Sequence, residues 1–170
     1  DNPLTNEAVM LGRRLFYDKR LSGNNEIACA HCHKQALAFS DGVKGSVGAS
    51  GKMLSFNSMS LVNLMWGPQH FFWDGRASSL EEQALIPIQH VDEMDQDIDE
   101  LVDELSDIDE YANLFEITYG ELNKHTIAKA LAAFQRSLVS ANSKYDQYNR
   151  AFPASRIKRF YSFMASIRCA

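Results

Sequence analysis

Residues 26–39 read EIACAHCHKQALAF, and no other segment of the chain says as much about its fold. Within it, Cys29-Ala30-His31-Cys32-His33 brings two thiols and two imidazoles into five positions. The spacing C-x-x-C-H is the attachment signature of a c-type haem. Two thiols three residues apart on one helical turn can each form a thioether to a vinyl group of one porphyrin, and the adjacent His then supplies a nitrogen to the iron. The motif predicts covalent attachment at Cys29 and Cys32, with His33 as the proximal ligand of the haem iron.

Two other chemistries use the same residue types. A structural zinc site needs four ligands, and His31 would have to be one of them because there is no second Cys pair. Thiol–disulfide chemistry of the thioredoxin kind expects a βαβ context. The only other cysteine is Cys169, so a disulfide framework is excluded. Haem attachment is the favoured interpretation, with His31 as a bystander, and the two alternatives remain open at this point.

Composition limits the class of protein. The chain has 170 residues, 45% of them hydrophobic and 23% charged, which suits one globular domain. No apolar run approaches the roughly 20 residues of a membrane span, and the first residues lack the features of a signal peptide. The net charge is −5, and residues 77–123 contain no Lys or Arg. Such an acidic face would repel phosphates, which excludes nucleic acid as the expected partner, and it can steer a basic protein.

Hydrophobic periodicity predicts helices along most of the chain. Thr5 caps a first helix, the Cys/His cluster opens a short second one, residues 78–88 form a helix that ends at Pro87, and amphipathic helices cover 97–108 and 125–140. Residues 41–57 are rich in Gly and Ser without a period, which predicts a long functional loop. Residues 60–66, SLVNLMW, are predicted to be a short buried segment. The fold class expected is all-α, a cytochrome c-like haem domain with long loops.

Three further stretches carry a family resemblance: NPLTNEAVMLGRRLFYDKRLSGNN at 2–25, FFWDGRASSLEEQALIPIQHVDEM at 71–94 and YDQY at 145–148. Together with the C-x-x-C-H motif they resemble the N-terminal haem domain of the bacterial di-haem cytochrome c peroxidases, a family that includes the methylamine-utilisation di-haem enzyme. The resemblance implies that this haem is the peroxidatic one, that it reduces hydrogen peroxide, and that a second haem domain relays electrons from a small donor protein such as a cytochrome c.

The resemblance also implies site residues. Gln83 and Glu93 would lie over the open face of the haem, where a carboxylate can move the proton that O–O cleavage requires and an amide can orient the peroxide. Trp73 would lie between the two haems, with Phe72 packed beside it. The alternatives are a solvated helix carboxylate for Glu93 and an ordinary core aromatic for Trp73.

Two more implied roles concern charge and metal. Arg76 would pair with a haem propionate or with Asp74, because a guanidinium binds carboxylates in a forked geometry. Asn57 would give a side-chain oxygen to a calcium ion whose other ligands come largely from the second domain.

The sequence departs from the family in the long loop. Family members that rest in an inactive state carry a histidine there that caps the iron, whereas this chain has Ala49 and Ser50 and no histidine from 34 to 69. We therefore expect an open distal site without reductive activation. His70, His90 and Met94 are the residues that would contradict this expectation by reaching the iron.

The second departure follows YDQY. The predicted haem domain covers 1–148, and 149–170 form a basic tail that ends in Cys169-Ala170. This tail is interpreted either as the start of a second haem domain or as an unrelated truncated tail, and the sequence leaves both open. Because haem c is attached outside the bacterial inner membrane, a periplasmic location is expected. The alternative functions are a mono-haem electron-transfer cytochrome and a haem-based ligand-binding module.

Overall fold

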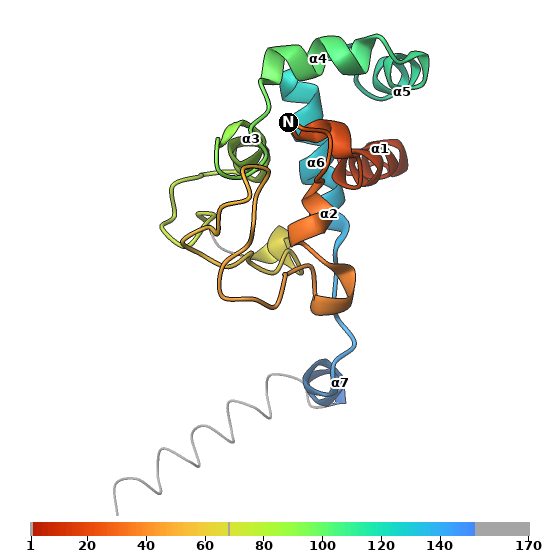
Figure 1. Ribbon diagram of the computed structural model, residues 1–170. Coiled ribbons are helices and arrows are strands. Elements are labelled where there is room, and N and C mark those ends of the chain that lie inside the picture. Colours follow the sequence, from red (N-terminus) through yellow and green to blue (C-terminus); the bar gives the residue numbers. More distant parts are fainter. Residues whose placement is uncertain (1, 68, 152–170) are drawn as a thin grey trace, which may run out of the picture. The chain divides into compact units, whose positions relative to one another are not determined.

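The structure is a computed structural model that describes residues 2–67 and 69–151. These residues form α-helices and short 3₁₀ turns, and their only β pairings are three isolated bridges, so the all-α prediction is confirmed (Figure 1). The chain divides into two compact units, one up to Leu138 and one from Val139. The helices of the first unit are α1 (Asn6–Phe16), α2 (Cys29–Cys32), α3 (Leu80–Gln89), α4 (Ile98–Ser106), α5 (Asp109–Tyr119) and α6 (Lys124–Ser137).

The first unit is organised by the close crossing of α1 and α6, which make more contacts with each other than any other pair of elements (Figure 1). Thr5 caps α1 as predicted, because its side chain accepts a hydrogen bond from the Ala8 amide at 3.2 Å. At the crossing, a Cβ on Gly12 would overlap the carbonyl oxygen of Ala130. The glycine therefore lets the two helix backbones touch.

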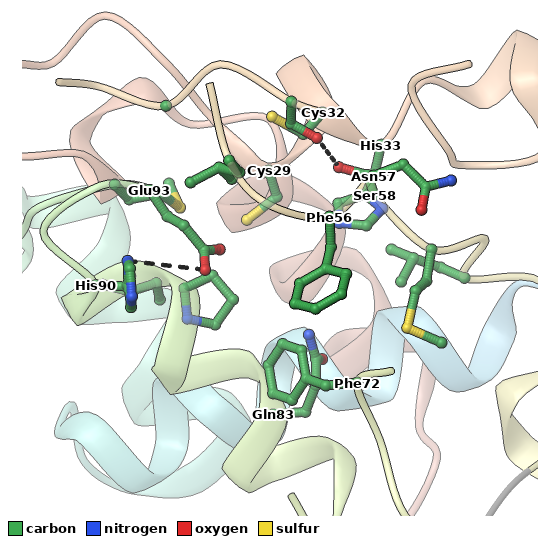
Figure 2. Close-up of a pocket in the computed structure, with 18 of the residues that line it drawn as sticks. Cys29, Cys32, His33, Phe56, Asn57, Ser58, Phe72, Gln83, His90 and Glu93 are labelled. Atoms are coloured by element: carbon green, nitrogen blue, oxygen red, sulfur yellow. Dashed lines mark hydrogen bonds and ion pairs between the residues drawn. The ribbon is translucent and has the colours of Figure 1, made fainter. Parts of the chain in front are cut away.

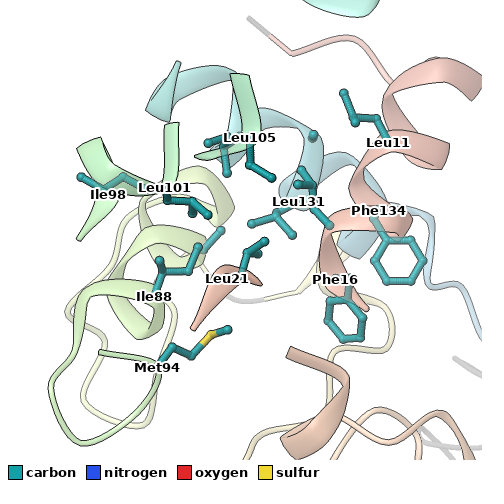
Figure 3. Close-up of a cluster of buried hydrophobic side chains, with 14 of the residues drawn as sticks. Leu11, Phe16, Leu21, Ile88, Met94, Ile98, Leu101, Leu105, Leu131 and Phe134 are labelled. Atoms are coloured by element: carbon teal, nitrogen blue, oxygen red, sulfur yellow. The ribbon is translucent and has the colours of Figure 1, made fainter. Parts of the chain in front are cut away.

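A single hydrophobic core joins α1, α3, α4, α5 and α6 (Figure 3). Phe16 and Phe134 lie together with ring centroids 5.0 Å apart, and Phe39 from the loop after α2 meets both rings edge-on. The fully buried side chains are Leu11, Leu15, Phe16, Leu21, Ile88, Leu101, Leu105, Phe115, Ile127 and Leu131. This core supports the elements that line the candidate site.

The region between α3 and α6 contains one helix more than predicted. The periodic segment 97–108 ends at Ser106, and Ile108 instead precedes α5, which buries Tyr111 and Phe115. α3 also extends beyond Pro87 to Gln89. The predicted end at Pro87 is therefore wrong: only two residues follow the proline, and complete burial of Ile88 outweighs the missing amide hydrogen bond.

Loops fill the space between α2 and α3. Residues 41–57 contain no helix, as predicted, and a bridge between Val47 and Met53 closes the loop between them. The segment 60–66 was predicted to be buried, and this is only partly correct: Leu61 is buried, but Met65 and Trp66 are exposed. The reason is local, because Asn63 adopts a left-handed conformation and the 3₁₀ turn Leu64–Trp66 points two side chains outward.

The second unit contains α7 (Lys144–Ala151) among the described residues. Ser143 and Asp146 exchange hydrogen bonds at its start, with the Asp146 amide donating to the Ser143 hydroxyl at 3.1 Å. Most of the predicted basic tail, including Cys169, lies outside the described residues. Of the helices described, none combines the length and apolar character needed to span a lipid bilayer.

Candidate functional site

A cavity of about 520 Å³ lies between α2, α3, α6 and the loops, within the size range of ligand sites (Figure 2). In this view Cys29, Cys32 and His33 lie along one side, Gln83 and Phe72 along the other, and Glu93 beside them. All of the site residues predicted from the sequence line this cavity: Cys29, Cys32, His33, Asn57, Phe72, Trp73, Arg76, Gln83 and Glu93.

Cys29 and Cys32 lie one turn apart on α2, which is a single helical turn closed by the His33 amide donating to the Cys29 carbonyl at 2.9 Å. They do not form a disulfide. Burial raises the pKa of the Cys29 thiol to about 12, and burial together with the nearby Asp41 carboxylate raises that of Cys32. High pKa values leave few thiolates, the reactive form in redox and zinc chemistry. The pair is therefore poorly suited to thiol–disulfide exchange, while its spacing suits two thioethers.

His33 is held by a main-chain contact. Its Nδ1 lies 2.8 Å from the Phe39 carbonyl oxygen, which can only accept, so Nδ1 carries the proton and Nε2 keeps its lone pair. Burial lowers the pKa of His33, which favours this neutral form against main-chain hydrogen bonds to Phe39 and Met59. A tight turn aims the carbonyl, because Ala38 and Phe39 both have positive φ and Lys34 pairs with Ser40. A neutral imidazole with an oriented free nitrogen is what a metal requires of a histidine.

A buried polar network lies beside Cys32. The Ser46 hydroxyl donates to the Asp41 carboxylate at 2.5 Å and lies 2.7 Å from the Ser58 hydroxyl. The Val43 amide also donates to Asp41. Sequence reasoning missed these residues, since they belong to a loop without a period. They tie the loop to the Cys/His segment.

Two glutamine side chains face the cavity without partners of their own. The Oε1 atoms of Gln83 on α3 and of Gln135 on α6 are buried and accept no hydrogen bond. Gln135 is only 5% exposed, and no pattern in the sequence distinguishes it from the other polar residues of α6. An unpaired buried amide oxygen costs about 1–3 kcal/mol, so both atoms are suited to a ligand that donates hydrogen bonds.

Glu93 follows α3 in a turn, with its side chain 23% exposed. Burial raises the pKa of its carboxyl, partly offset by the His90 imidazole at 3.9 Å and by Arg76. The alternative of a freely solvated carboxylate is therefore wrong. A carboxyl whose pKa is shifted toward neutrality can take up and release a proton. Met94, next to it, is buried in the core and also lines the cavity.

The Phe-Trp-Asp-Gly-Arg segment forms part of the cavity's rim. The Nη1 group of Arg76 donates to both carboxylate oxygens of Asp74, at 3.0 and 2.9 Å, and the guanidinium lies 3.7 Å from the centre of the Phe72 ring. Of the two predicted partners of Arg76, the structure shows Asp74. Trp73 is 60% exposed, and its indole N–H points to the Asn57 carbonyl at 3.4 Å. The alternative of a core aromatic is wrong, because this tight turn carries Trp73 to the surface.

The described residues offer no ready-made metal cluster. Within 2–67 and 69–151, no three or more His, Cys, Asp or Glu side chains gather so that they could hold an ion. Asn57 is exposed and offers one amide oxygen, so the calcium role stays a prediction.

The cavity fits a covalently attached haem. It provides two thiols at thioether spacing, an imidazole held at Nδ1 by a main-chain carbonyl, and largely apolar walls. The family model for the di-haem cytochrome c peroxidases matches residues 6–152. The chain belongs to this family. The family's haem oxidoreductase chemistry implies haem c as the cofactor.

Known relatives agree with this assignment. The chain is 39% identical to the methylamine utilization protein MauG of Methylorubrum extorquens over 99% of its own length and 50% of that protein's. It is 32% identical to the cytochrome c551 peroxidase of Pseudomonas aeruginosa, over 96% and 49% respectively. Among solved structures, a MauG-like protein associated with microbial copper homeostasis superposes with a TM-score of 0.81 at 35% identity, covering 89% of this chain and 46% of that one. The cytochrome c-like fold is thereby confirmed, and the chain spans about half the length of these relatives.

Proposed function

We propose that this chain is the peroxidatic haem c domain of a protein that reduces hydrogen peroxide with electrons from a small redox protein. The overall change converts one H₂O₂, two electrons and two protons into two waters. The observation that carries the proposal is the meeting, at one cavity, of His33, held at Nδ1 by the Phe39 carbonyl, with Glu93 and Gln83, which offer a proton carrier and an unpaired amide oxygen.

In this proposal Cys29 and Cys32 hold the haem, His33 supplies the proximal nitrogen, and the bound haem supplies the redox-active iron. Glu93 takes the proton from one peroxide oxygen and returns it to the oxygen that leaves, and its raised pKa suits both steps. Gln83 accepts a hydrogen bond from the peroxide at Oε1 and so orients it. Arg76, engaged by Asp74, keeps positive charge near the rim.

Electrons are proposed to enter from a partner. The exposed indole of Trp73 at the rim would face a second haem domain, and the acidic surface of α4 and α5 would attract a basic donor. Asn57 is proposed to contribute an oxygen to a calcium ion at the same rim. The proposal includes an open distal site in the resting protein, because the long loop offers no histidine. It also includes a periplasmic location.

The test is an absorption spectrum of the ferric protein, produced with its haem, before and after addition of hydrogen peroxide. A high-spin spectrum that changes with peroxide is expected. In Glu93→Gln the rate of that change should fall about 10²- to 10⁴-fold, the usual contribution of a general acid–base group. The exposed Glu121→Gln is the matched control and should react like the unaltered protein.

The opposite result would favour the electron-carrier alternative. A low-spin ferric spectrum that does not respond to peroxide would mean that a strong second ligand occupies the iron. Met94 is the side chain to test first, because it is buried and lines the cavity. Met94→Leu would then convert the spectrum to high spin.

A further inference from the structure

Glu93 is carried by a compact turn, residues 90–95, between α3 and α4. The Glu93 and Asp95 amides both donate to the His90 carbonyl, at 2.9 and 3.1 Å, and the Met94 amide donates to the Pro87 carbonyl at 3.2 Å. Asp95 has φ +48°, a left-handed conformation that non-glycine residues seldom adopt. The turn is thus tightly wound, and its carbonyl groups point outward to other segments.

The loop 47–53 presses on one side of this turn. A Cβ on Gly48 would overlap the Asp92 carbonyl oxygen and lie 2.7 Å from that of Glu93. The Ala49 amide, next in sequence, donates to the Glu93 carbonyl at 2.6 Å. The absent side chain of Gly48 is therefore what allows this short hydrogen bond to the main chain of Glu93.

A different loop presses on the other side. A Cβ on Gly23 would overlap the Asp95 carbonyl oxygen, and the Gly23 amide donates to the Met94 carbonyl at 2.9 Å. The turn is thus held from two separate segments, each through a glycine with no room for a side chain and through a main-chain hydrogen bond at or beside that glycine.

An ion pair between side chains reinforces the contact of the loop 47–53 with the turn. Lys52 Nζ lies 3.1 Å from Asp92 Oδ1, within the loop that the Val47–Met53 bridge closes. The Lys52 side chain is largely exposed, so this ion pair contributes little energy by itself. The ion pair helps to align the loop with the turn, which the Ala49 amide already binds through the Glu93 carbonyl.

We propose that Gly48 and Gly23 are positioning residues that clamp the 90–95 turn and thereby fix the carboxyl group of Glu93 at the cavity. This inference rests on the proposed function only in its expected effect on the rate of the reaction with hydrogen peroxide. The charged groups that face Glu93 are His90 and Arg76; His90 is part of the turn that the clamp holds, and neither side chain is altered by a substitution at Gly48 or Gly23. Removal of the clamp therefore changes the position of the carboxyl group without removing its charged neighbours.

The test compares glycine variants of the full haem-loaded chain. Gly48→Ala should slow the reaction with hydrogen peroxide by up to about 10²-fold, the effect of displacing a catalytic group by about 1 Å. Hydrogen–deuterium exchange in the peptide containing residues 90–95 should rise in the same variant. Gly120→Ala is the matched control: Gly120 ends α5 at φ +79° with open space around it, so the variant is strained but remote. It should lose stability with no change in either measurement.

Variants of Lys52 provide a milder test in case the Gly48→Ala chain does not fold. Lys52→Met should accelerate exchange in the same peptide and slow the peroxide reaction a few-fold, Lys52→Arg should restore both, and the exposed Lys44→Met should change neither. Unchanged exchange in both Gly48→Ala and Lys52→Met would overturn the clamp. If the unaltered protein does not react with peroxide, the proposed function fails, while the exchange measurements still decide whether the clamp exists.

Discussion

The helices and the loops of the first unit are held together in different ways. α1, α4, α5 and α6 meet through buried apolar side chains, and a chain of Leu, Ile and Phe contacts runs through them. In residues 33–79, by contrast, main-chain hydrogen bonds define the shape, and four of the non-glycine residues that the structure describes there have positive φ: Ala38, Phe39, Asn63 and Phe72. Side-chain burial thus stabilises the helical part, whereas backbone geometry shapes the loop part, which supplies His33 and the rim of the proposed site.

The largest expected effect on stability is in the helical part. Leu105 on α4 is completely buried and does not line the cavity. Leu105→Ala should lower the free energy of unfolding by about 2–5 kcal/mol, because it leaves a cavity in the core. Urea denaturation would measure this, with the exposed Met10→Ala as the control. A large loss of peroxide reactivity in those Leu105→Ala molecules that remain folded would contradict the division between the two parts, because it would mean that core packing also controls the site.

A smaller effect is expected where α5 is tied to the end of α1. The Tyr111 hydroxyl donates to the Asp18 carboxylate at 2.6 Å. Burial alone would raise the pKa of Asp18, but hydrogen bonds from Arg20 and Tyr111 outweigh it and hold that pKa below its usual range. Tyr111→Phe should therefore cost about 1.5–3 kcal/mol, the range for bonds to charged groups.

That cost depends on pH with a definite sign. A carboxyl group with a lowered pKa contributes stability that is present above its ordinary pKa and is lost as the pH falls through the lowered value. The difference in unfolding free energy between the parent and Tyr111→Phe should narrow in acid. A difference that is constant from pH 7 to pH 2 would show that the bond does not depend on the charge of Asp18.

The smallest effect on the free energy of unfolding is expected in the site, and there the substitution should stabilise the protein instead of destabilising it. Burial raises the pKa of Glu93, so the cost of its buried charge is absent below the ordinary pKa of a glutamate and is complete above the raised value. Glu93→Gln should therefore be more stable than the parent at pH 7 and equal to it near pH 3. Thermal unfolding at the two pH values measures this. A variant less stable at pH 7 would mean that the contacts of Glu93 with His90 outweigh its burial.

The same division explains what could be predicted from the sequence. The first helix, the amphipathic segment before Ser106 and the long helix containing Phe134 were predictable because apolar residues repeat at helical spacing along them. α5 was missed, although Tyr111 and Phe115 share a face and Gly120 marks its end. The end of α3 was placed too early because local proline chemistry was weighed without the burial of Ile88, which depends on the tertiary structure.

For the site, the motif and the family resemblance selected residues that do meet at one cavity, but their surroundings could not be foreseen. Nothing in the sequence indicates that Asp41 lies beside Cys32, that Gln135 faces the cavity or that Gly48 touches the Asp92 carbonyl. Asp41 and Gly48 lie in a loop without a period, and Gln135 is one polar residue among several on α6, so none of these contacts leaves a local pattern in the sequence.

The bond from His33 to the Phe39 carbonyl has a consequence for how this protein tolerates genetic change. The acceptor is a main-chain oxygen, so no codon change at position 39 deletes it. Such changes act only through the shape of the turn, and glycine, which adopts positive φ freely, would preserve that shape. The orientation of the imidazole is thereby buffered against substitution of the Phe39 side chain.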